Sequence, residues 1–123
     1  IPTYKLKILR TLKKNFPIYM VSNTNITHIE YTRKNLFREN GLTIDDYFDK
    51  LYFSYEIGAS KPDEEFYKRV IDDTKVNPAE SLFLDDKIEN INGARQAGFQ
   101  VCQVGPEDNL REKLFPFLNG ISI

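Results

Sequence analysis

The chain has 123 residues and a formal net charge of -1 at pH 7, and 41% of its residues are hydrophobic and 28% are charged. This length and composition are typical of one globular domain with an ordinary core. The net charge is too small for the basic surface with which proteins bind nucleic acid or anionic membranes. No apolar run approaches the roughly 18 residues of a membrane-spanning helix. We therefore expect neither nucleic acid nor a membrane as a partner.

The spacing of apolar residues predicts helices and strands in alternation. In chain order, the expected helices are residues 3–15, 26–40, 64–75, 87–98 and 107–118, with short helical turns at 43–49 and at Pro78. The expected strands are residues 17–21, 50–55, 81–84 and 99–104, and residues 56–63 are expected to form a loop. Such alternation predicts an α/β fold, a doubly wound parallel sheet with right-handed crossovers.

The first expected helix carries an apolar face that should cover a sheet, and strand 17–21 is apolar enough to be buried on both faces. That face is formed by Leu6, Leu9, Leu12 and Phe16. In helix 87–98 the residues at helical spacing are Ile88, Ile91, Ala94, Arg95 and Ala97.

The single cysteine, Cys102, lies in the expected strand 99–104, so we expect it to be a small buried hydrophobic residue. One cysteine excludes a disulfide within the chain. This suits a reducing compartment, and we expect the protein to be cytoplasmic.

Two adjacent carboxylates follow strand 81–84. Asp85 and Asp86 stand where this strand ends and helix 87–98 begins. Ligands bind outside the carboxyl ends of parallel strands in α/β sheets, and carboxylate oxygens are suitable ligands for Mg²⁺. The same acids would also interact favourably with the dipole of the helix that follows. By itself, the pair is therefore equally consistent with a metal site and with a helix start.

A polar stretch, Ser22 to Asn25, ends strand 17–21. Small hydroxyl and amide side chains can donate hydrogen bonds to an anion at such a strand end. They are also the preferred N-cap residues of a helix, and the stretch taken alone fits a cap better. His28, the only histidine, has no cysteine or second histidine with which to form a metal set, so we interpret it as a packing or surface residue.

Lys61 ends the loop 56–63 and precedes Pro62, which disfavours helical geometry at the lysine. A lysine in this place can point into a site, although a solvent-exposed surface lysine is the more common case. The polar stretch, Lys61 and the acidic pair follow three consecutive strands, whose ends meet at one edge of a parallel sheet. Together they predict a site that binds a phosphate and its metal ion.

These motifs resemble those of the haloacid dehalogenase-like hydrolase superfamily, most of whose members are Mg²⁺-dependent phosphatases with a Rossmann-like core. Residues 21–24 are similar to its second motif and residues 58–63 to its third. Residues 82–90 and 94–98 are similar to its fourth motif, with a spacing like that of the subgroup that includes the phosphatase domain of soluble epoxide hydrolases and bacterial sugar-phosphate phosphatases.

The resemblance implies roles for particular residues. Ser22 and Asn23 would bind the phosphoryl group during its transfer, and Lys61 would pair with both the phosphate and the nucleophile. The implied activity is Mg²⁺-dependent hydrolysis of a small phosphorylated metabolite through an aspartyl-phosphate.

The fourth motif implies the metal site. Asp86 would be a direct Mg²⁺ ligand and Asn90 would support it from close by. Asp85 would support the same site, so that Lys61 and Asp85 are the catalytic residues expected within this chain.

One departure from the family is that no Asp-x-Asp occurs in the sequence. In the family this first motif ends the first strand and supplies the nucleophile and the general acid and base. We therefore expect residues 1–123 to be the carboxyl-terminal part of a single core domain, with the first strand and the cap domain upstream. That strand would lie between the strands ending at Val21 and Leu84. Because two buried edges would lack a partner without it, we expect these residues alone to be neither stably folded nor active.

Two other functions fit parts of the pattern. A non-catalytic phosphate-binding or regulatory module would keep the same fold and phosphate site without the nucleophile. A response-regulator receiver domain also combines acids, a hydroxyl and a lysine around Mg²⁺, but there the acids come first and the lysine last. Dehalogenation is disfavoured because Asp85 and Asp86 fit a metal-dependent site.

Overall fold

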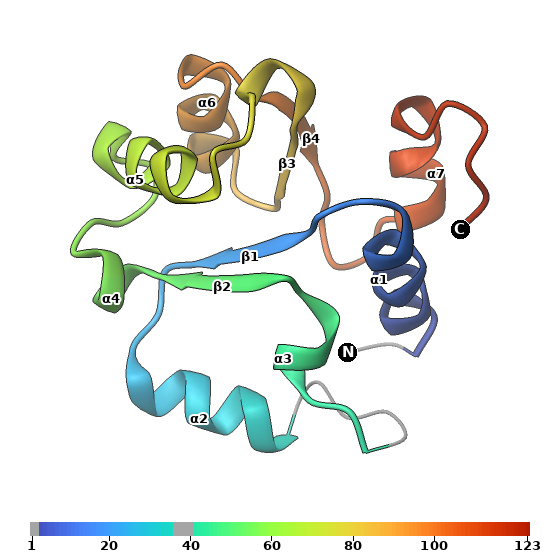
Figure 1. The fold of residues 1–123 in the computed structure, drawn as a ribbon, viewed down its shortest axis with the longest axis horizontal. Coiled ribbons are helices and arrows are strands. Elements are labelled where there is room, and N and C mark those ends of the chain that lie inside the picture. The colour runs from blue at the N-terminus through green and yellow to red at the C-terminus, as the bar shows by residue number, and fades with distance from the viewer. Residues whose placement is uncertain (1–2, 36–40) are drawn as a thin grey trace. The chain divides into compact units, whose positions relative to one another are not determined.

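The computed structural model describes residues 3–35 and 41–123, in which helices and parallel strands alternate (Figure 1). The helices are α1 (Thr3–Asn15), α2 (Ile26–Asn35), α3 (Ile44–Tyr47), α4 (Ser54–Ile57), α5 (Glu64–Thr74), α6 (Ile88–Gln96) and α7 (Leu110–Leu114). The strands are β1 (Tyr19–Ser22), β2 (Lys50–Phe53), β3 (Leu82–Asp85) and β4 (Gln100–Gln103), and two 3₁₀ turns, η1 (Pro78–Glu80) and η2 (Phe115–Phe117), complete the elements. The predicted α/β class is confirmed.

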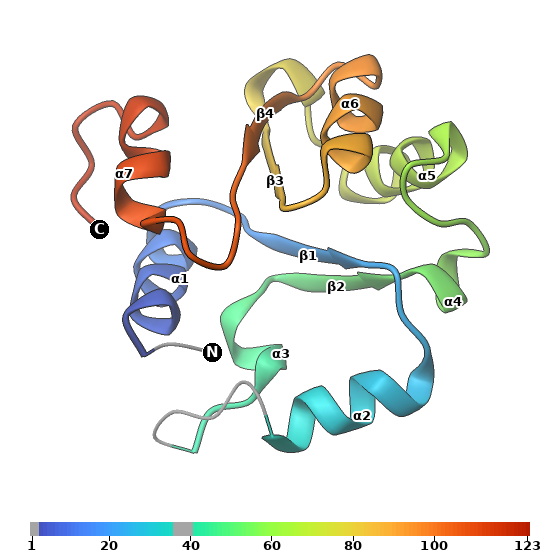
Figure 2. The ribbon, with the colours of Figure 1, turned by 180° about the vertical axis from the view of Figure 1, so that it is seen from behind.

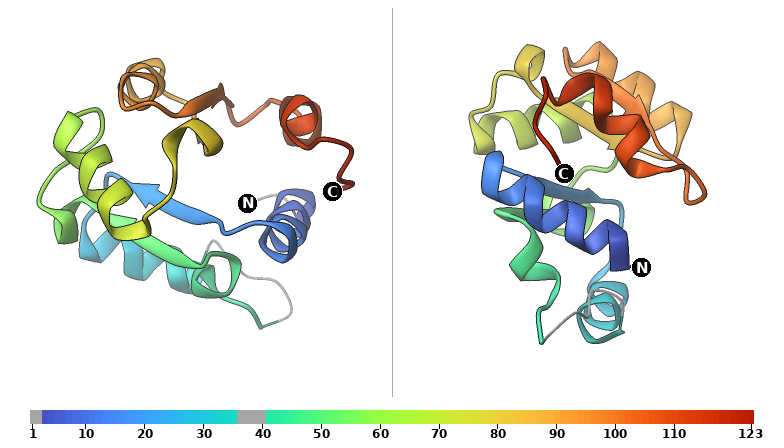
Figure 3. Two further views of the ribbon diagram at one scale, coloured as in Figure 1. Left: turned by 45° about the horizontal axis from the view of Figure 1, so that its top comes forward. Right: turned by 90° about the vertical axis from the view of Figure 1, so that its right-hand side faces the viewer.

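The chain forms two compact units, one up to Glu56 together with Ile123 and one from Ile57 to Ser122. In the first unit β1 and β2 pair in parallel, from Tyr19 opposite Lys50 to Ser22 opposite Phe53. The two strands lie side by side from other directions as well (Figure 3). β1 is half-buried along its length, where strand 17–21 was expected to be buried on both faces.

The core of the first unit forms where α1 meets α3. Leu6, Ile44 and Tyr47 are buried there, and the half-buried residues packed against them are Leu9, Leu42, Phe48, Met20 and Leu51. The start of α3 is held by Asp46, whose Oδ2 accepts a hydrogen bond from the Thr43 amide at 2.7 Å. This is one half of a capping box.

The predicted apolar face of α1 is wrong at one end. Phe16 is 36% exposed, whereas Ile8 is fully buried. α1 ends at Asn15, and Phe16 follows as the exposed residue at its carboxyl end, with its amide still bonded to the Leu12 carbonyl at 2.8 Å.

In the second unit β3 and β4 pair in parallel, from Leu82 opposite Gln100 to Asp85 opposite Gln103. α6 packs on both strands, and α5 contacts α6 (Figure 2). The rings of Tyr67 and Phe83 meet edge to face in this core, with their centroids 5.6 Å apart. Within the described part of the chain, no further strand joins either pair. The first-motif strand and the single-domain organisation expected from the sequence stay predictions.

Several boundaries differ from the predicted ones. Residues 54–57 form the helix α4, where strand and loop were expected. The Ser54 hydroxyl accepts a hydrogen bond from the Thr24 amide at 2.9 Å, and this contact holds Ser54 at the point where β2 ends and α4 begins. The expected helix 107–118 is reduced to α7 and η2, since Asn109 caps α7 by accepting from the Glu112 amide at 3.2 Å. Residues 36–40 of the expected helix 26–40 lie outside the described residues.

In α6, Ile91 and Ala94 are buried, whereas Ile88, which begins the helix, is 50% exposed. Cys102 is half-buried and so less buried than expected, and its thiol donates to the Lys113 carbonyl at 3.8 Å. Among residues 3–35 and 41–123, no helix is long and apolar enough to cross a membrane.

Candidate active site

Asp85 is the last residue of β3 and turns its side chain back over the start of α6. Its backbone carbonyl accepts from the Val104 amide at 2.9 Å, which continues the pairing with β4. Its Oδ1 accepts from the Lys87 amide at 3.1 Å, two residues further on. Such a side-chain bond is an Asx turn, and it fixes one carboxylate oxygen against the backbone. The other oxygen, Oδ2, faces the rest of the site.

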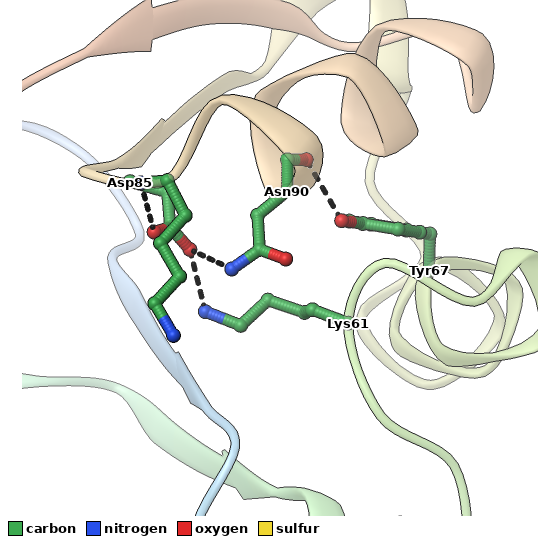
Figure 4. A network of polar contacts seen from close by, with 5 residues as sticks. Lys61, Tyr67, Asp85 and Asn90 are labelled. Carbon is green, nitrogen blue, oxygen red and sulfur yellow. Dashed lines mark hydrogen bonds and ion pairs between the residues drawn. The ribbon is translucent and has the colours of Figure 1, made fainter.

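Lys61 lies at the end of the loop before α5, where a cis peptide bond joins it to Pro62. Its Nζ donates to Asp85 Oδ2 at 2.6 Å (Figure 4). The side chains are only 9% and 7% exposed, so this is a buried ion pair. The Lys61 ammonium group also lies 5.8 Å from the centre of the Phe83 ring. The structure thus places Lys61 inside the unit and against Asp85, and not on the surface.

Asn90 is a second hydrogen-bond donor to Asp85 Oδ2, beside Lys61. Its Nδ2 donates to Asp85 Oδ2 at 3.1 Å, and the residue is 4% exposed in the first turn of α6. The backbone carbonyl of Asn90 accepts from the Tyr67 hydroxyl at 2.8 Å. The Asp85 carboxylate is therefore held by a lysine, an amide side chain and a backbone amide.

These contacts determine the charge of Asp85. Burial is the largest single influence and raises the pKa of its carboxyl. The hydrogen bonds from Lys61 and the Lys87 amide, together with the charge of Lys61 and a contact with Asp86, outweigh burial and hold the pKa below its usual value. Asp85 is therefore ionised at neutral pH, and its share of the folding stability is lost only as the pH falls through this lowered pKa.

Asp86 follows directly and is exposed. Its backbone carbonyl accepts from Gln103 Nε2 at 2.9 Å, which ties the turn to β4. No group of three or more His, Cys, Asp or Glu side chains that could hold a metal ion occurs in the part of the chain that the structure describes. Mg²⁺ commonly takes one or two carboxylates and completes its octahedron with water and substrate phosphate. An exposed carboxylate beside the anchored Asp85 fits one such ligand position.

Ser22 is the last residue of β1 in the first unit and is half-buried, and Asn23, which follows it, is exposed. The alternative role of the polar stretch, capping α2, is confirmed, and its last residue provides the cap. Asn25 Oδ1 accepts from the His28 amide at 2.9 Å, so the cap requires neither Ser22 nor Asn23. The structure brings Lys61, Asp85 and Asn90 together, and the approach of Ser22 and Asn23 to them stays a prediction. His28 is exposed, as expected for a surface residue.

Two residues of this region were not singled out in the sequence. Tyr67 has helical spacing with the core of α5, which gives no hint of its hydrogen bond to α6. Gly93 offered a signal that was overlooked, because glycine inside a helix costs stability and often marks a close approach. A Cβ atom on Gly93 would lie 2.8 Å from Tyr67 Cε2 and 3.0 Å from the Pro62 carbonyl oxygen.

Gly93→Ala should therefore destabilise the protein by about 1–3 kcal/mol, as overpacking does. Helix propensity alone would give the opposite sign, since alanine is favoured over glycine by about 1 kcal/mol. Urea denaturation of the complete protein measures the difference, with Gln96→Ala as an exposed control in the same helix. A Gly93→Ala variant at least as stable as the wild type would contradict the close packing of α6 on Tyr67.

The sequence matches a family model and known proteins. The model of the family described as haloacid dehalogenase-like hydrolase matches residues 1–98. The chain is 36% identical over 115 residues to the D-ribitol-5-phosphate phosphatase of Bacteroides thetaiotaomicron, covering 94% of this chain and 56% of that protein. It is 31% identical over 86 residues to the rat bifunctional epoxide hydrolase 2, covering 70% of this chain and 15% of that protein.

Solved structures give the same result. A wild-type haloacid dehalogenase family enzyme from Bacteroides thetaiotaomicron, in complex with magnesium and inorganic phosphate, has a TM-score of 0.87 at 35% identity, covering 91% of this chain and 57% of that one. A haloacid dehalogenase-like hydrolase from Porphyromonas gingivalis has a TM-score of 0.89 at 28% identity, covering 98% and 59%. The chain thus spans little more than half the length of the bacterial relatives and 15% of the rat protein. The resemblance seen in the motifs is confirmed, and the chain belongs to the haloacid dehalogenase-like hydrolase family.

Proposed function

We propose that the complete protein is a Mg²⁺-dependent phosphatase that acts on a small phosphorylated metabolite. The observation that carries this proposal is the buried contact of Lys61 and Asn90 with Asp85, directly beside the exposed Asp86. It places a fixed cation from the loop before α5 against a fixed carboxylate at the end of β3, with an accessible carboxylate as the next residue. The phosphatase from Bacteroides thetaiotaomicron supports the same chemistry, and its name suggests a phosphorylated sugar alcohol or sugar as the substrate class.

In this proposal each residue of the site has one task. Asp85 holds the Lys61 ammonium group in place, where its charge neutralises that of the phosphate and the attacking carboxylate. Asp86 is a ligand for Mg²⁺, which when bound would stabilise the charge that develops on the phosphoryl oxygens. Ser22 and Asn23 donate hydrogen bonds to those oxygens. No Asp-x-Asp occurs in these 123 residues, so the proposal takes the nucleophile from outside this chain.

The proposal predicts phosphatase activity that depends on Mg²⁺. The complete protein should hydrolyse p-nitrophenyl phosphate, lose this activity in excess EDTA and recover it when Mg²⁺ is added. A series of sugar and sugar-alcohol phosphates, assayed by release of inorganic phosphate, then defines the substrate class. Turnover that EDTA leaves unchanged would contradict the metal-dependent mechanism. Binding of phosphate without any turnover would indicate the non-catalytic module instead.

A further inference from the structure

Tyr67 joins α5 to the first turn of α6. The residue is 1% exposed, and its hydroxyl donates to the Asn90 backbone carbonyl at 2.8 Å (Figure 4). In an α-helix this carbonyl oxygen also accepts from the amide four residues further on, so the helix does not need the tyrosine. The bond instead fixes α6 relative to α5 at the residue whose side chain reaches Asp85.

Tyr67 packs closely against α6 at Gly93, and the backbone of Pro62 approaches the same position. A Cβ atom on Gly93 would lie 2.8 Å from Tyr67 Cε2 and 2.9 Å from its hydroxyl oxygen, so only glycine lets α6 come this close. The same position is 3.0 Å from the carbonyl oxygen of Pro62, the residue after Lys61. Tyr67 therefore packs where the chain that carries Lys61 meets the helix that carries Asn90.

The hydroxyl keeps its proton at all ordinary pH values. Burial, and then the negative charges of Asp85 and Asp63, raise the pKa of Tyr67 to about 12. Tyr67 is thus a permanent hydrogen-bond donor. Its hydroxyl is bound to the backbone of Asn90, which suits a positioning task and not proton transfer.

From this geometry we propose that Tyr67 is a positioning residue of the active site: its bond to the Asn90 carbonyl sets the first turn of α6 so that the Asn90 amide reaches Asp85 Oδ2. The inference rests on the proposed phosphatase function, because it assigns Tyr67 a part in that reaction. Without this bond α6 can shift, and the Asp85 carboxylate loses one of the donors that orient it toward Lys61.

The first test is Tyr67→Phe in the complete protein, which keeps the ring and removes the hydroxyl. We expect kcat for p-nitrophenyl phosphate to fall about 10-fold, the lower end of what supporting residues of a metal site contribute, with KM nearly unchanged. The melting temperature should fall by about 2–4 °C. Tyr31→Phe removes the same group from a side chain that is 56% exposed on α2, and should leave kcat unchanged.

A double-mutant comparison separates positioning from stability. In Asn90→Ala the backbone carbonyl and its bond to Tyr67 remain, but no amide is left to position. Adding Tyr67→Phe to this variant should lower the melting temperature as before without lowering kcat further. An equal loss of kcat in both backgrounds, or wild-type kcat of Tyr67→Phe in the presence of Asn90, would overturn the proposal.

Asp86→Asn, assayed beside these variants, distinguishes a failure of the positioning role from a failure of the proposed phosphatase function. If Asp86→Asn abolishes turnover while Tyr67→Phe retains wild-type kcat, the positioning role alone is overturned. If Asp86→Asn is fully active, the proposed metal-dependent phosphatase is overturned, and the role of Tyr67 in it falls as well.

Discussion

Asp86→Asn is expected to lower kcat of the complete protein by about 10³-fold or more, because a bound metal ion contributes several kcal/mol to transition-state stabilisation. Asparagine keeps the size of the side chain and removes its charge. Asp86 is exposed, and the hydrogen bond from Gln103 goes to its backbone carbonyl. The substitution should therefore leave the folded structure intact.

The measurement is kcat of wild type and variant over a titration of Mg²⁺, with circular dichroism as the check of folding. Asp72→Asn on α5 is the matched control, since it makes the same chemical change on an exposed acidic pair away from Asp86. We expect the control to keep wild-type kcat and the same Mg²⁺ requirement. An Asp86→Asn variant with wild-type kcat and Mg²⁺ requirement would rule out Asp86 as a metal ligand.

The sequence is most informative where local spacing decides the structure. The boundaries predicted for α1, Thr3 to Asn15, are those of the structure. β3 and α6 were also found close to their predicted places, because an apolar run ending in acids and followed by helical spacing is a local signal. α4 was missed because it depends on Ser54 and Thr24, which are 30 positions apart.

For the site, residue types at strand ends were enough to identify the participants but not their contacts. Lys61 and Asp85 were predicted to lie at one edge of the sheet, and they form an ion pair across 24 positions. The part of Tyr67 could not be predicted, because its partner is a backbone carbonyl that any residue possesses. Polar residues such as Ser22 and Asn25 fit both a cap and an anion site, and only the structure assigns the cap to Asn25.

Lys61→Met is expected to destabilise the complete protein by about 3–5 kcal/mol at pH 7, the usual cost of removing one partner of a buried ion pair. The Asp85 side chain, which is 7% exposed in the structure, would lose its cation and keep the neutral donors from Asn90 and the Lys87 amide. Urea denaturation gives the free energy of unfolding. The double variant Lys61→Met, Asp85→Asn removes both charges and should regain most of the lost stability while remaining inactive.

The pH dependence of the stability lost in Lys61→Met tests whether Asp85 is ionised in the folded protein. In the wild type the pKa of Asp85 is lowered on folding, so its stabilisation is present above the unfolded value of about 3.9 and is lost as the pH falls below it. Lys61→Met removes the hydrogen bond and the charge of Lys61, so burial, the largest single influence, is expected to raise the folded pKa above the unfolded one. Between the unfolded pKa and this raised folded pKa, the free energy of unfolding of Lys61→Met should fall as the pH rises. The stability that Lys61→Met loses relative to the wild type should therefore be smaller at pH 5 than at pH 7. An equal loss at both values would mean that the lysine stabilises the fold by packing and not by pairing with an ionised Asp85.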